Sequence, residues 1–458
     1  MNEKPNIIFV FSDQHRAQAV GYNGNEDVKT PNLDQLKQES ISFSNAISGN
    51  PVCSPYRASL LTGQYPQTHG VFVNDVQLNP EVTSIAKVLK NEGYETAYVG
   101  KWHLDGRGRS NFIPEERRQG FDYWKVLECT HDYNNSIYYG DTPEQKQWDG
   151  YDAIAQTENV QDYIKTRGQE SPFVLFLSWG PPHAPYRTAP ERFQKMYNPQ
   201  DLTLRPNVPE DGISTNPGRP GIAADEVKKD LAGYYAHISA LDYCIGELVD
   251  TIKNKGIEDN TIFVYTSDHG DLLGSHGAYK KQRPYEESIK VPFLLKYPEE
   301  FGGEEIEISK PINAPDIMPT LLGLSGVSIP DSVEGLNFAP FLRGEKELDR
   351  EGVVLECLHP FGQWHQGVGG REYRGLRTER YTYVKTLEGD WLLYNNEKDP
   401  YQLENLVEEE EYTEIKEKLD EILEQELEKR GDQFLPGEKY IEKWGYETDE
   451  TGTVPCEA

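Results

Sequence analysis

The residues best suited to chemistry lie in the segment Cys53-Ser-Pro-Tyr-Arg57, which brings a thiol, a proline and a guanidinium close together. The simplest interpretation is a surface turn, because Pro55 fixes its own φ angle and a free cysteine behaves as a small hydrophobic residue. The residues Ala58-Ser-Leu-Leu61 that follow predict a helix beginning at or just after Cys53. Because the N-terminus of a helix has unpaired N–H groups and a positive potential, this segment is suited to an anionic ligand.

Further polar residues follow runs that are typical of buried strands. Asn6–Ser12, Pro172–Trp179 and Thr261–Ser267 are short and almost continuously apolar. In open α/β sheets, ligands bind beyond the carboxyl ends of the strands. The polar residues expected at that edge are Asp13, Gln14, Lys101, His103, His183, Asp268 and His269.

Four of these residues, Asp13, Gln14, Asp268 and His269, predict a site for one divalent cation. A single Asp after a strand is as typical of a turn or a helix cap. Together, the oxygen donors favour Ca²⁺ or Mg²⁺. A nitrogen donor at His269 also suits Mn²⁺ or Zn²⁺. Ca²⁺ is the first expectation, and Cys53 is expected to face the same ion.

The predicted elements divide the chain into two domains. Up to residue 345, strands alternate with helices expected at Thr30–Glu39, Thr83–Asn91 and Ala224–Lys255. This alternation predicts an α/β fold with a mainly parallel sheet covered on both faces. Residues 1–345 are therefore expected to form the catalytic domain.

Residues 346–458 show a different pattern. Gly352–Cys357, Tyr373–Lys385 and Trp391–Asn395 predict strands without helices between them, hence an antiparallel sheet. One amphipathic helix follows, with its acidic face outward. Asn198–Gly221, in the first domain, is rich in Pro, Asn and Gly and predicts a surface loop. The second domain is expected to be a small α+β unit that contributes to the substrate pocket.

The motif Cys53-x-Pro55-x-Arg57 resembles that of the formylglycine-dependent sulfatases of the alkaline phosphatase superfamily, although Tyr56 stands where a small residue is usual. The resemblance extends from Asn6 to the residues around Tyr401. It implies an alkaline-phosphatase-like α/β/α sandwich and a sulfuric ester hydrolase whose cysteine is oxidised to an aldehyde by a formylglycine-generating maturation enzyme. The hydrated aldehyde would attack sulfur, expel the alcohol and release sulfate as the aldehyde reforms.

The resemblance also implies roles for residues outside the motif. Three cations would orient the nucleophile or bind sulfate oxygens: Arg57, Lys101 and Lys281. Lys280 is the alternative to Lys281 if the alignment shifts by one residue. His103 would take a proton from the second hydroxyl, and His183 would protonate the leaving alcohol.

Substrate contacts are expected from two regions. Asn74 and Asp75 are expected to face the pocket. In the second domain, the glycine-rich loop from Gly362 to Gly370 either folds over the pocket mouth or is a simple turn between strands. The residues of this domain expected to contact the substrate are His359, Trp364, His365 and Arg371. They favour a sulfated carbohydrate, and hence a role in polysaccharide degradation, with an aryl or choline sulfate as the alternative.

Two other functions compete with the sulfatase hypothesis. Gln14 and His269 also fit phosphonate monoester or phosphodiester hydrolases of the same superfamily, whereas Lys101-Trp-His103 favours a sulfatase. The other alternative is a non-catalytic protein that binds a metal or a sulfated glycan, with Cys53 unconverted.

The composition limits the partners and the compartment. The net charge of −31 argues against nucleic acid or an anionic membrane as a partner. Salt screens bulk charge beyond about 8 Å, so basic residues near Cys53 can set the local sign. The five cysteines show no disulfide framework. No signal peptide or membrane span is visible, so the expected location is cytoplasmic, or periplasmic or secreted if a signal has been removed.

Overall fold

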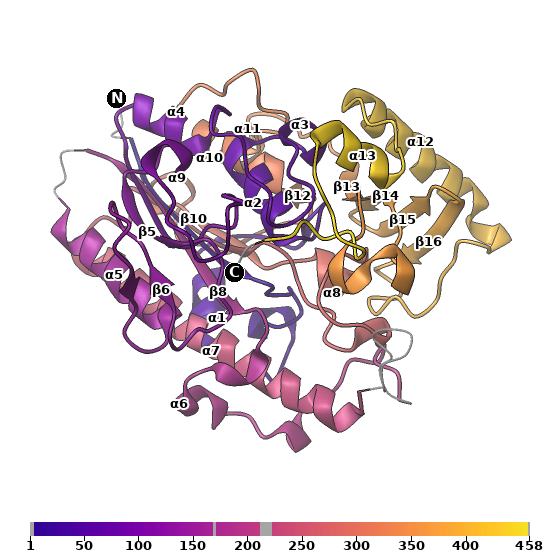
Figure 1. The fold of residues 1–458 in the computed structure, drawn as a ribbon, viewed down its shortest axis with the longest axis horizontal. Helices are drawn as coiled ribbons and strands as arrows, with labels where there is room; N and C mark the ends of the chain where they lie inside the picture. Colours follow the sequence, from indigo (N-terminus) through magenta and orange to yellow (C-terminus); the bar gives the residue numbers. More distant parts are fainter. Residues whose placement is uncertain (1–3, 168–170, 211–221, 457–458) are drawn as a thin grey trace.

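The computed structural model describes residues 4–167, 171–210 and 222–456, which form a larger part and a smaller C-terminal part (Figure 1). In these residues the larger part contains an eight-stranded sheet. The strands, in spatial order, are β11 (Ile306–Ile308), β2 (Ile41–Phe43), β10 (Phe293–Lys296), β9 (Thr261–Ser267), β1 (Asn6–Asp13), β8 (Phe173–Pro182), β4 (Glu95–Lys101) and β5 (Tyr123–Leu127).

The central strands of this sheet run in one direction. β1 pairs in parallel with both β8 and β9, and β4 pairs in parallel with β8 and β5. Only the β10 side is mixed, because β10 is antiparallel to both β9 and β2. The prediction of a mainly parallel sheet is confirmed.

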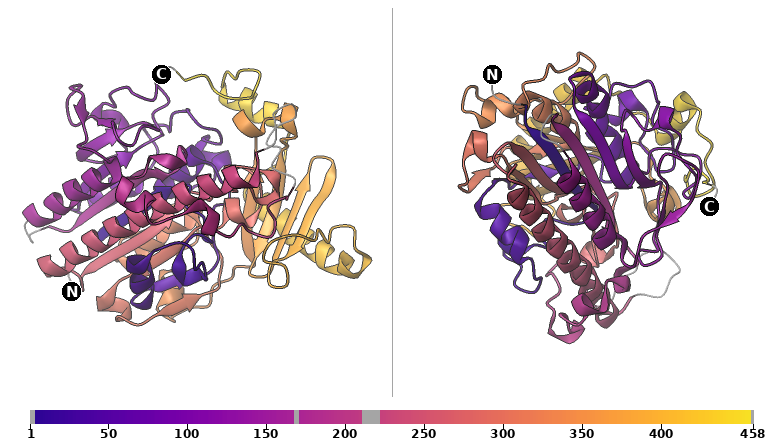
Figure 2. Two further views of the ribbon diagram at one scale, coloured as in Figure 1. Left: turned by 90° about the horizontal axis from the view of Figure 1, so that it is seen from below. Right: turned by 90° about the vertical axis from the view of Figure 1, so that its left-hand side faces the viewer.

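Helices cover both faces of the sheet because the strand side chains alternate between two hydrophobic cores (Figure 2). Ile7 and Phe9 of β1 pack in one core with α2 (Cys53–Thr62), α4 (Ile85–Asn91) and α10 (Ala314–Leu324). Ile8 and Val10 pack in the other core with α1 (Pro31–Gln38), α5 (Asp152–Thr166) and α7 (Ala224–Lys255).

The smaller part is built on the antiparallel strands β13 (Gly352–Cys357), β14 (Tyr373–Thr378), β15 (Tyr381–Thr386) and β16 (Gly389–Asn395), paired in that order. One face of this sheet packs against Leu419, Leu423 and Leu427 of α12 (Thr413–Lys429). The other face packs against Ile47 and Ile289 of the larger part. The two parts therefore share a hydrophobic contact.

The chain returns to the larger part after α13 (Gly437–Trp444). The ring of Trp444 lies against Gly70, and the Tyr446 hydroxyl donates a hydrogen bond to the Gly70 carbonyl. The C-terminal segment therefore ends near the middle of the view in Figure 1.

Three sequence predictions need correction. Tyr373–Lys385 is two strands, because the Thr378 hydroxyl accepts hydrogen bonds from the backbone N–H groups of Arg380 and Tyr381 and forms a turn. The helix predicted at Thr30–Glu39 is α1, Pro31–Gln38; Thr30 is its N-cap residue, but the Thr30 hydroxyl bonds to Gly21 and Asp34 and not to the helix backbone. The helix predicted from Thr83 begins at Ile85, because Ser84 is its N-cap.

The region predicted as a loop at Asn198–Gly221 contains a short 3₁₀ turn, Pro199–Asp201, and residues 211–221 lie outside the described residues. The other short elements are β3 (Ala46–Ile47), β6 (Ile137–Tyr138), β7 (Lys146–Gln147), β12 (Ile312–Asn313), α3 (Pro66–His69), α6 (Glu191–Gln194), α8 (Glu286–Ile289), α9 (Pro298–Phe301) and α11 (Ala339–Leu342). Within the described parts of the chain, every helix is too short or too polar to span a bilayer.

Candidate active site

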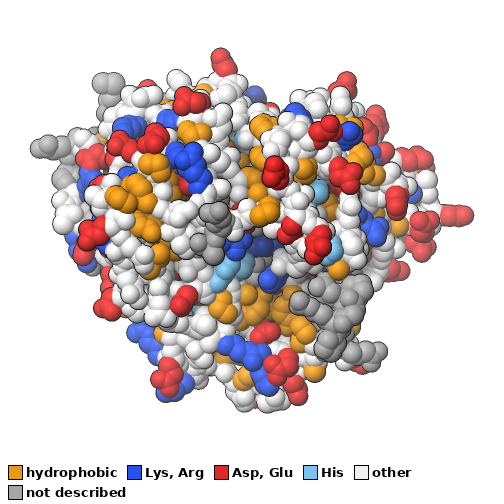
Figure 3. All heavy atoms as spheres, in the orientation of Figure 1, with side chains coloured by type: hydrophobic (Ala, Val, Ile, Leu, Met, Phe, Trp, Pro, Cys, Tyr) orange, Lys and Arg blue, Asp and Glu red, His pale blue; other side chains and the backbone are white. Residues whose placement is uncertain are grey.

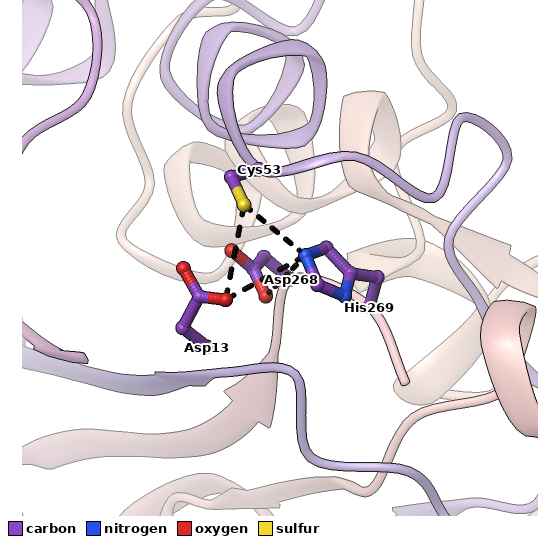
Figure 4. A group of neighbouring side chains, drawn as sticks. All are labelled: Asp13, Cys53, Asp268 and His269. Carbon is purple, nitrogen blue, oxygen red and sulfur yellow. Dashed lines mark hydrogen bonds and ion pairs between the residues drawn. The ribbon is translucent and has the colours of Figure 1, made fainter. Parts of the chain in front are cut away.

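Four buried side chains converge at the carboxyl ends of the central strands (Figure 4). Asp13 ends β1, Asp268 and His269 follow β9, and Cys53 is the first residue of α2. Their ligand atoms all lie within 4.8 Å of one another. His269 Nε2 lies 3.3 Å from Cys53 Sγ and 3.6 Å from a carboxylate oxygen of each aspartate. The topology thus brings together four of the residues predicted at the strand ends and the motif.

Gln14 supplies a further donor to this group. Its backbone has a φ angle of 76°, and its N–H donates a hydrogen bond of 3.0 Å to Asp268 Oδ1. The side-chain Nε2 donates to Asp271 at 2.6 Å, whereas the buried Oε1 has no hydrogen-bond partner among the described residues. A buried polar atom without a partner is costly. The two carboxylates, the amide oxygen and the imidazole nitrogen therefore fit a divalent cation.

Three buried cations surround the same group. Arg57 lies 3.2 Å from Asp13 and 3.2 Å from Asp268. Lys101 Nζ lies 2.7 Å from Asp13 Oδ2, and Lys281 Nζ lies 2.9 Å from Cys53 Sγ. This last contact favours Lys281 over the neighbouring Lys280. Since buried charges must be paired, the cations and the acids depend on one another.

The cations reverse the sign of the local potential in an acidic protein. Burial and Asp13 raise the pKa of the Cys53 thiol, but Lys101, Lys281 and His269 together hold that pKa well below its ordinary value. Burial also raises the pKa of Asp13, and the lysines bring it well below its ordinary value. Position 53 is therefore suited to carry negative charge.

His103 is held by an ion pair at the edge of the site. It has a φ angle of 60°, and its Nε2 lies 3.2 Å from Asp75 Oδ1. Arg109 donates hydrogen bonds to the same carboxylate from Nε at 3.0 Å and from Nη2 at 2.7 Å. Burial lowers the pKa of His103, but Cys129 and Asp75 raise it to about 9. Asp75 is 3% exposed and both of its oxygens are engaged, so it is placed to orient His103.

His183 follows β8 and stacks on a second histidine. Its Nδ1 lies 2.8 Å from the Ala184 carbonyl, and its ring lies 4.8 Å from that of His131. Burial and Lys281 lower the pKa of His183 well below its ordinary value. His131 was missed in the sequence because it follows β5, a strand that was not predicted. Arg109 was missed because it lies in the long loop between β4 and β5, where no motif marks it.

The other predicted substrate residues lie outside this buried group. Asn74 Oδ1 accepts a hydrogen bond from the Ser54 N–H at the start of α2. His359 is wedged between Gly437 and Gly452 of the C-terminal segment. The glycine-rich loop forms two 3₁₀ turns, Gly362–Trp364 and Gln366–Val368. Trp364, His365 and Arg371 lie in or beside this loop.

Glu128 is a residue that the sequence did not point to, and it is 1% exposed. Its carboxylate accepts hydrogen bonds from the N–H groups of Leu104, Asp105 and Gly106, at 3.2, 2.7 and 3.0 Å. These residues follow His103 directly. Glu128 thus fixes the loop that carries a predicted catalytic histidine.

We expect Glu128→Gln to lower kcat about tenfold and the free energy of unfolding by about 2 kcal/mol, because an amide N–H₂ would face a backbone donor. Burial raises the pKa of Glu128 from 4.5 to about 7. Between these values the folded protein keeps a proton that the unfolded chain releases, so this group's contribution to stability falls as pH rises. The difference in free energy of unfolding between the wild type and Glu128→Gln, measured with urea, should therefore decrease from pH 4.5 to pH 7. A difference that does not change with pH would contradict the raised pKa of Glu128.

Comparison with known proteins agrees with the geometry. The family model described as "Sulfatase" matches residues 5–327, and that for the "N-sulphoglucosamine sulphohydrolase, C-terminal" region matches residues 274–429. The chain is 43% identical to an ulvan-active sulfatase of Formosa agariphila, over 97% of this chain and 85% of the relative. It is 31% identical to an endo-4-O-sulfatase of Bacteroides thetaiotaomicron, over 88% of each.

A solved structure of a protein in complex with its substrate, D-glucosamine-2-N,6-O-disulfate, superposes with a TM-score of 0.84. It is 25% identical and covers 95% of this chain and 100% of its own. The expected fold and the resemblance are both confirmed.

Proposed function

The chain belongs to the sulfatase family and is a sulfuric ester hydrolase; on that premise we propose that it removes sulfate from a sulfated polysaccharide or its fragments. The observation that carries this proposal is the buried group at Cys53, where three cations face one anionic position at a helix N-terminus. The relatives named above, which include an ulvan-active sulfatase and an endo-4-O-sulfatase, support a sulfated glycan as the substrate class.

Two groups complete this site when present. Formylglycine at position 53 would supply a hydroxyl nucleophile, and a divalent cation would lower the pKa of that hydroxyl. Asp13, Gln14, Asp268 and His269 would hold the cation. We propose Ca²⁺, because three of these four residues offer oxygen donors.

The chain's own residues then bind and orient the ester. Lys281, which lies beside position 53, would bind sulfate oxygens and balance their charge. Lys101 and Arg57 would keep Asp13 ionised and hold it in place. Lys281 would therefore act on the sulfate oxygens directly, whereas Lys101 and Arg57 would act through Asp13.

The two histidines would move protons. Burial and Lys281 hold the pKa of His183 well below its ordinary value, and its Nδ1–H faces the Ala184 carbonyl, so Nε2 of the neutral ring is free to accept a proton. His183 would first take up a proton at Nε2, favoured by the negative charge of the bound ester, and then deliver it to the leaving alcohol. His103 is held by Asp75 and would exchange a proton with position 53.

A formylglycine-generating enzyme is the proposed partner in maturation. Cys53 and Arg57 are each 1% exposed, and Pro55 is buried in α2. A modifying enzyme therefore has access to this motif only before the chain has folded. We expect that exposing folded, unmodified protein to the maturation enzyme would leave Cys53 as a thiol.

The proposal is tested by measuring sulfate release from sulfated saccharides of ulvan and of glycosaminoglycans, alongside p-nitrophenyl sulfate and a phenylphosphonate monoester. We expect kcat/KM for the best sulfate ester to exceed that for the phosphonate by at least about 10²-fold, since a site selects the charge and geometry of its transition state. A phosphonate preference of that size would favour the phosphonate hydrolase alternative. Inactivity on every saccharide would reject the proposed substrate class.

A further inference from the structure

Two arginines and two tryptophans stack on one another where the segment after Lys281 meets the smaller part. They are Arg283, Trp364, Trp391 and Arg371, and we call this group the Arg–Trp wall. It is joined to the site through the chain, because Arg283 is two residues after Lys281, whose Nζ lies 2.9 Å from Cys53 Sγ. Gln282, between them, exchanges hydrogen bonds with the backbone of Phe361 at 2.9 and 3.3 Å.

The members of the wall are stacked in a continuous series. The Arg283 guanidinium lies 5.3 Å from the centre of the Trp364 ring, and that of Arg371 lies 4.9 Å from the Trp391 ring. The two indoles are 6.4 Å apart and nearly parallel, at 18°. Stacking on rigid rings fixes the planes of the guanidinium groups in advance of binding.

Neither arginine is neutralised by the protein. Within residues 4–167, 171–210 and 222–456, no carboxylate lies within 4.0 Å of Arg283 or Arg371 and no hydrogen bond to either side chain is present. By contrast, the nearby Arg374 and Arg377 are fully paired, with Asp432 and Glu286. Burial lowers the pKa of Arg283 to about 10, so it is charged at neutral pH but poorly solvated.

The guanidinium groups of Arg283 and Arg371 both lie close enough to Tyr285 to shift its pKa. Each of them lowers the pKa of Tyr285, opposing the larger effect of burial, which raises it. Figure 3 shows Lys, Arg and His side chains gathered in a hollow near the centre of this face, on a molecule whose rim is largely acidic. The unpaired charge of the wall is therefore concentrated around Tyr285, four residues after Lys281.

We propose that the Arg–Trp wall binds a second anionic group of the substrate, a carboxylate or a further sulfate on the sugar next to the scissile ester. This inference rests on the proposed function and narrows it to polyanionic saccharides. A planar guanidinium matches both groups, because each presents paired oxygens to its N–H donors. A neutral sulfated sugar would leave both arginines without a partner.

The test uses saccharides that differ by one anionic group. One pair is a sulfated, uronate-containing disaccharide and its carboxyl-reduced counterpart; the other is glucosamine-2-N,6-O-disulfate and N-acetylglucosamine-6-O-sulfate, whose acetamide is neutral. Dissociation constants are measured by calorimetry with Ca²⁺ on the full chain carrying Cys53→Ser, so that no probe is turned over. We expect the more anionic member of at least one pair to bind about tenfold more tightly, as a charge-assisted hydrogen bond implies.

When Arg283→Gln and Arg371→Gln are added to this variant, the two members of each pair should bind with nearly equal dissociation constants. Arg192→Gln is the matched control, because Arg192 also stacks on rings, those of Phe193 and Tyr243, but lies on α6. The pair that shows the preference identifies a carboxylate or a sulfate as the ligand. Equal binding within both pairs, or a preference that survives the double substitution, would overturn the inference. Failure of the proposed function is a separate result, namely no sulfate release from saccharides by the wild-type enzyme.

Discussion

Cys53→Ala is expected to lower kcat for sulfate esters by at least about 10⁴-fold, as removal of a covalent nucleophile does in other enzymes. The side chain lies at the meeting point of Lys281, His269 and Asp13, at 2.9, 3.3 and 3.8 Å, and no other group occupies that position among the described residues. Cys53→Ser should be equally inactive in multiple turnover, because a serine has no second hydroxyl on the same carbon to release sulfate.

The control for this variant is Cys244→Ala. Cys244 is also a buried free cysteine, but it lies in α7 and contacts the Ala153 carbonyl. It should retain activity, and thermal unfolding should show that Cys53→Ala is folded. Sustained multiple turnover by either Cys53 variant would contradict the proposed mechanism.

Asp13→Asn is expected to lower kcat/KM by at least about 10³-fold, because it removes a cation donor and weakens the electrostatic support of the nucleophile. The substitution also deprives Lys101 and Arg57 of a buried partner at 2.7 and 3.2 Å. Breaking a buried ion pair in this way should cost about 3 kcal/mol of stability. Steady-state kinetics, urea unfolding and metal content by plasma mass spectrometry measure the three effects.

A matched control is Asp122→Asn, which removes a surface ion pair with Lys90 whose members are 50% and 46% exposed. Such a pair contributes little, so activity, metal content and stability should be close to wild type. If Asp13→Asn kept its bound metal and most of its activity, Asp13 would not be a ligand in the sense proposed. The metal measured in the wild-type protein also tests the choice of Ca²⁺.

Much of the site could be predicted because its residues directly follow strands, or begin a helix, that the sequence pattern identifies. The continuous apolar runs of β1 and β9 identify central parallel strands, and such strands place the residues after them at one edge of the sheet. Asp13 and Asp268 follow from this rule alone. Cys53 follows from its place at the first turn of a predicted helix.

The rest depends on loops whose paths the sequence does not specify. Asp75, His103 and Gln14 have φ angles of 63°, 60° and 76°, which non-glycine residues rarely adopt and no local pattern predicts. For that reason the ion pair of Asp75 with His103 and Arg109 could not be predicted from the sequence. The Arg–Trp wall joins residues from distant segments, so only the packing of the two parts brings Arg283 to Trp364.

The central claim, that position 53 is an aldehyde in the active protein, is tested most directly by the mass of the tryptic peptide Gln38–Arg57 from an active preparation. We expect the mass of a formylglycine-containing peptide. The fraction of the peptide that carries formylglycine should rise in proportion to sulfatase turnover across preparations. A fully active preparation in which this peptide carries only the cysteine thiol would contradict it.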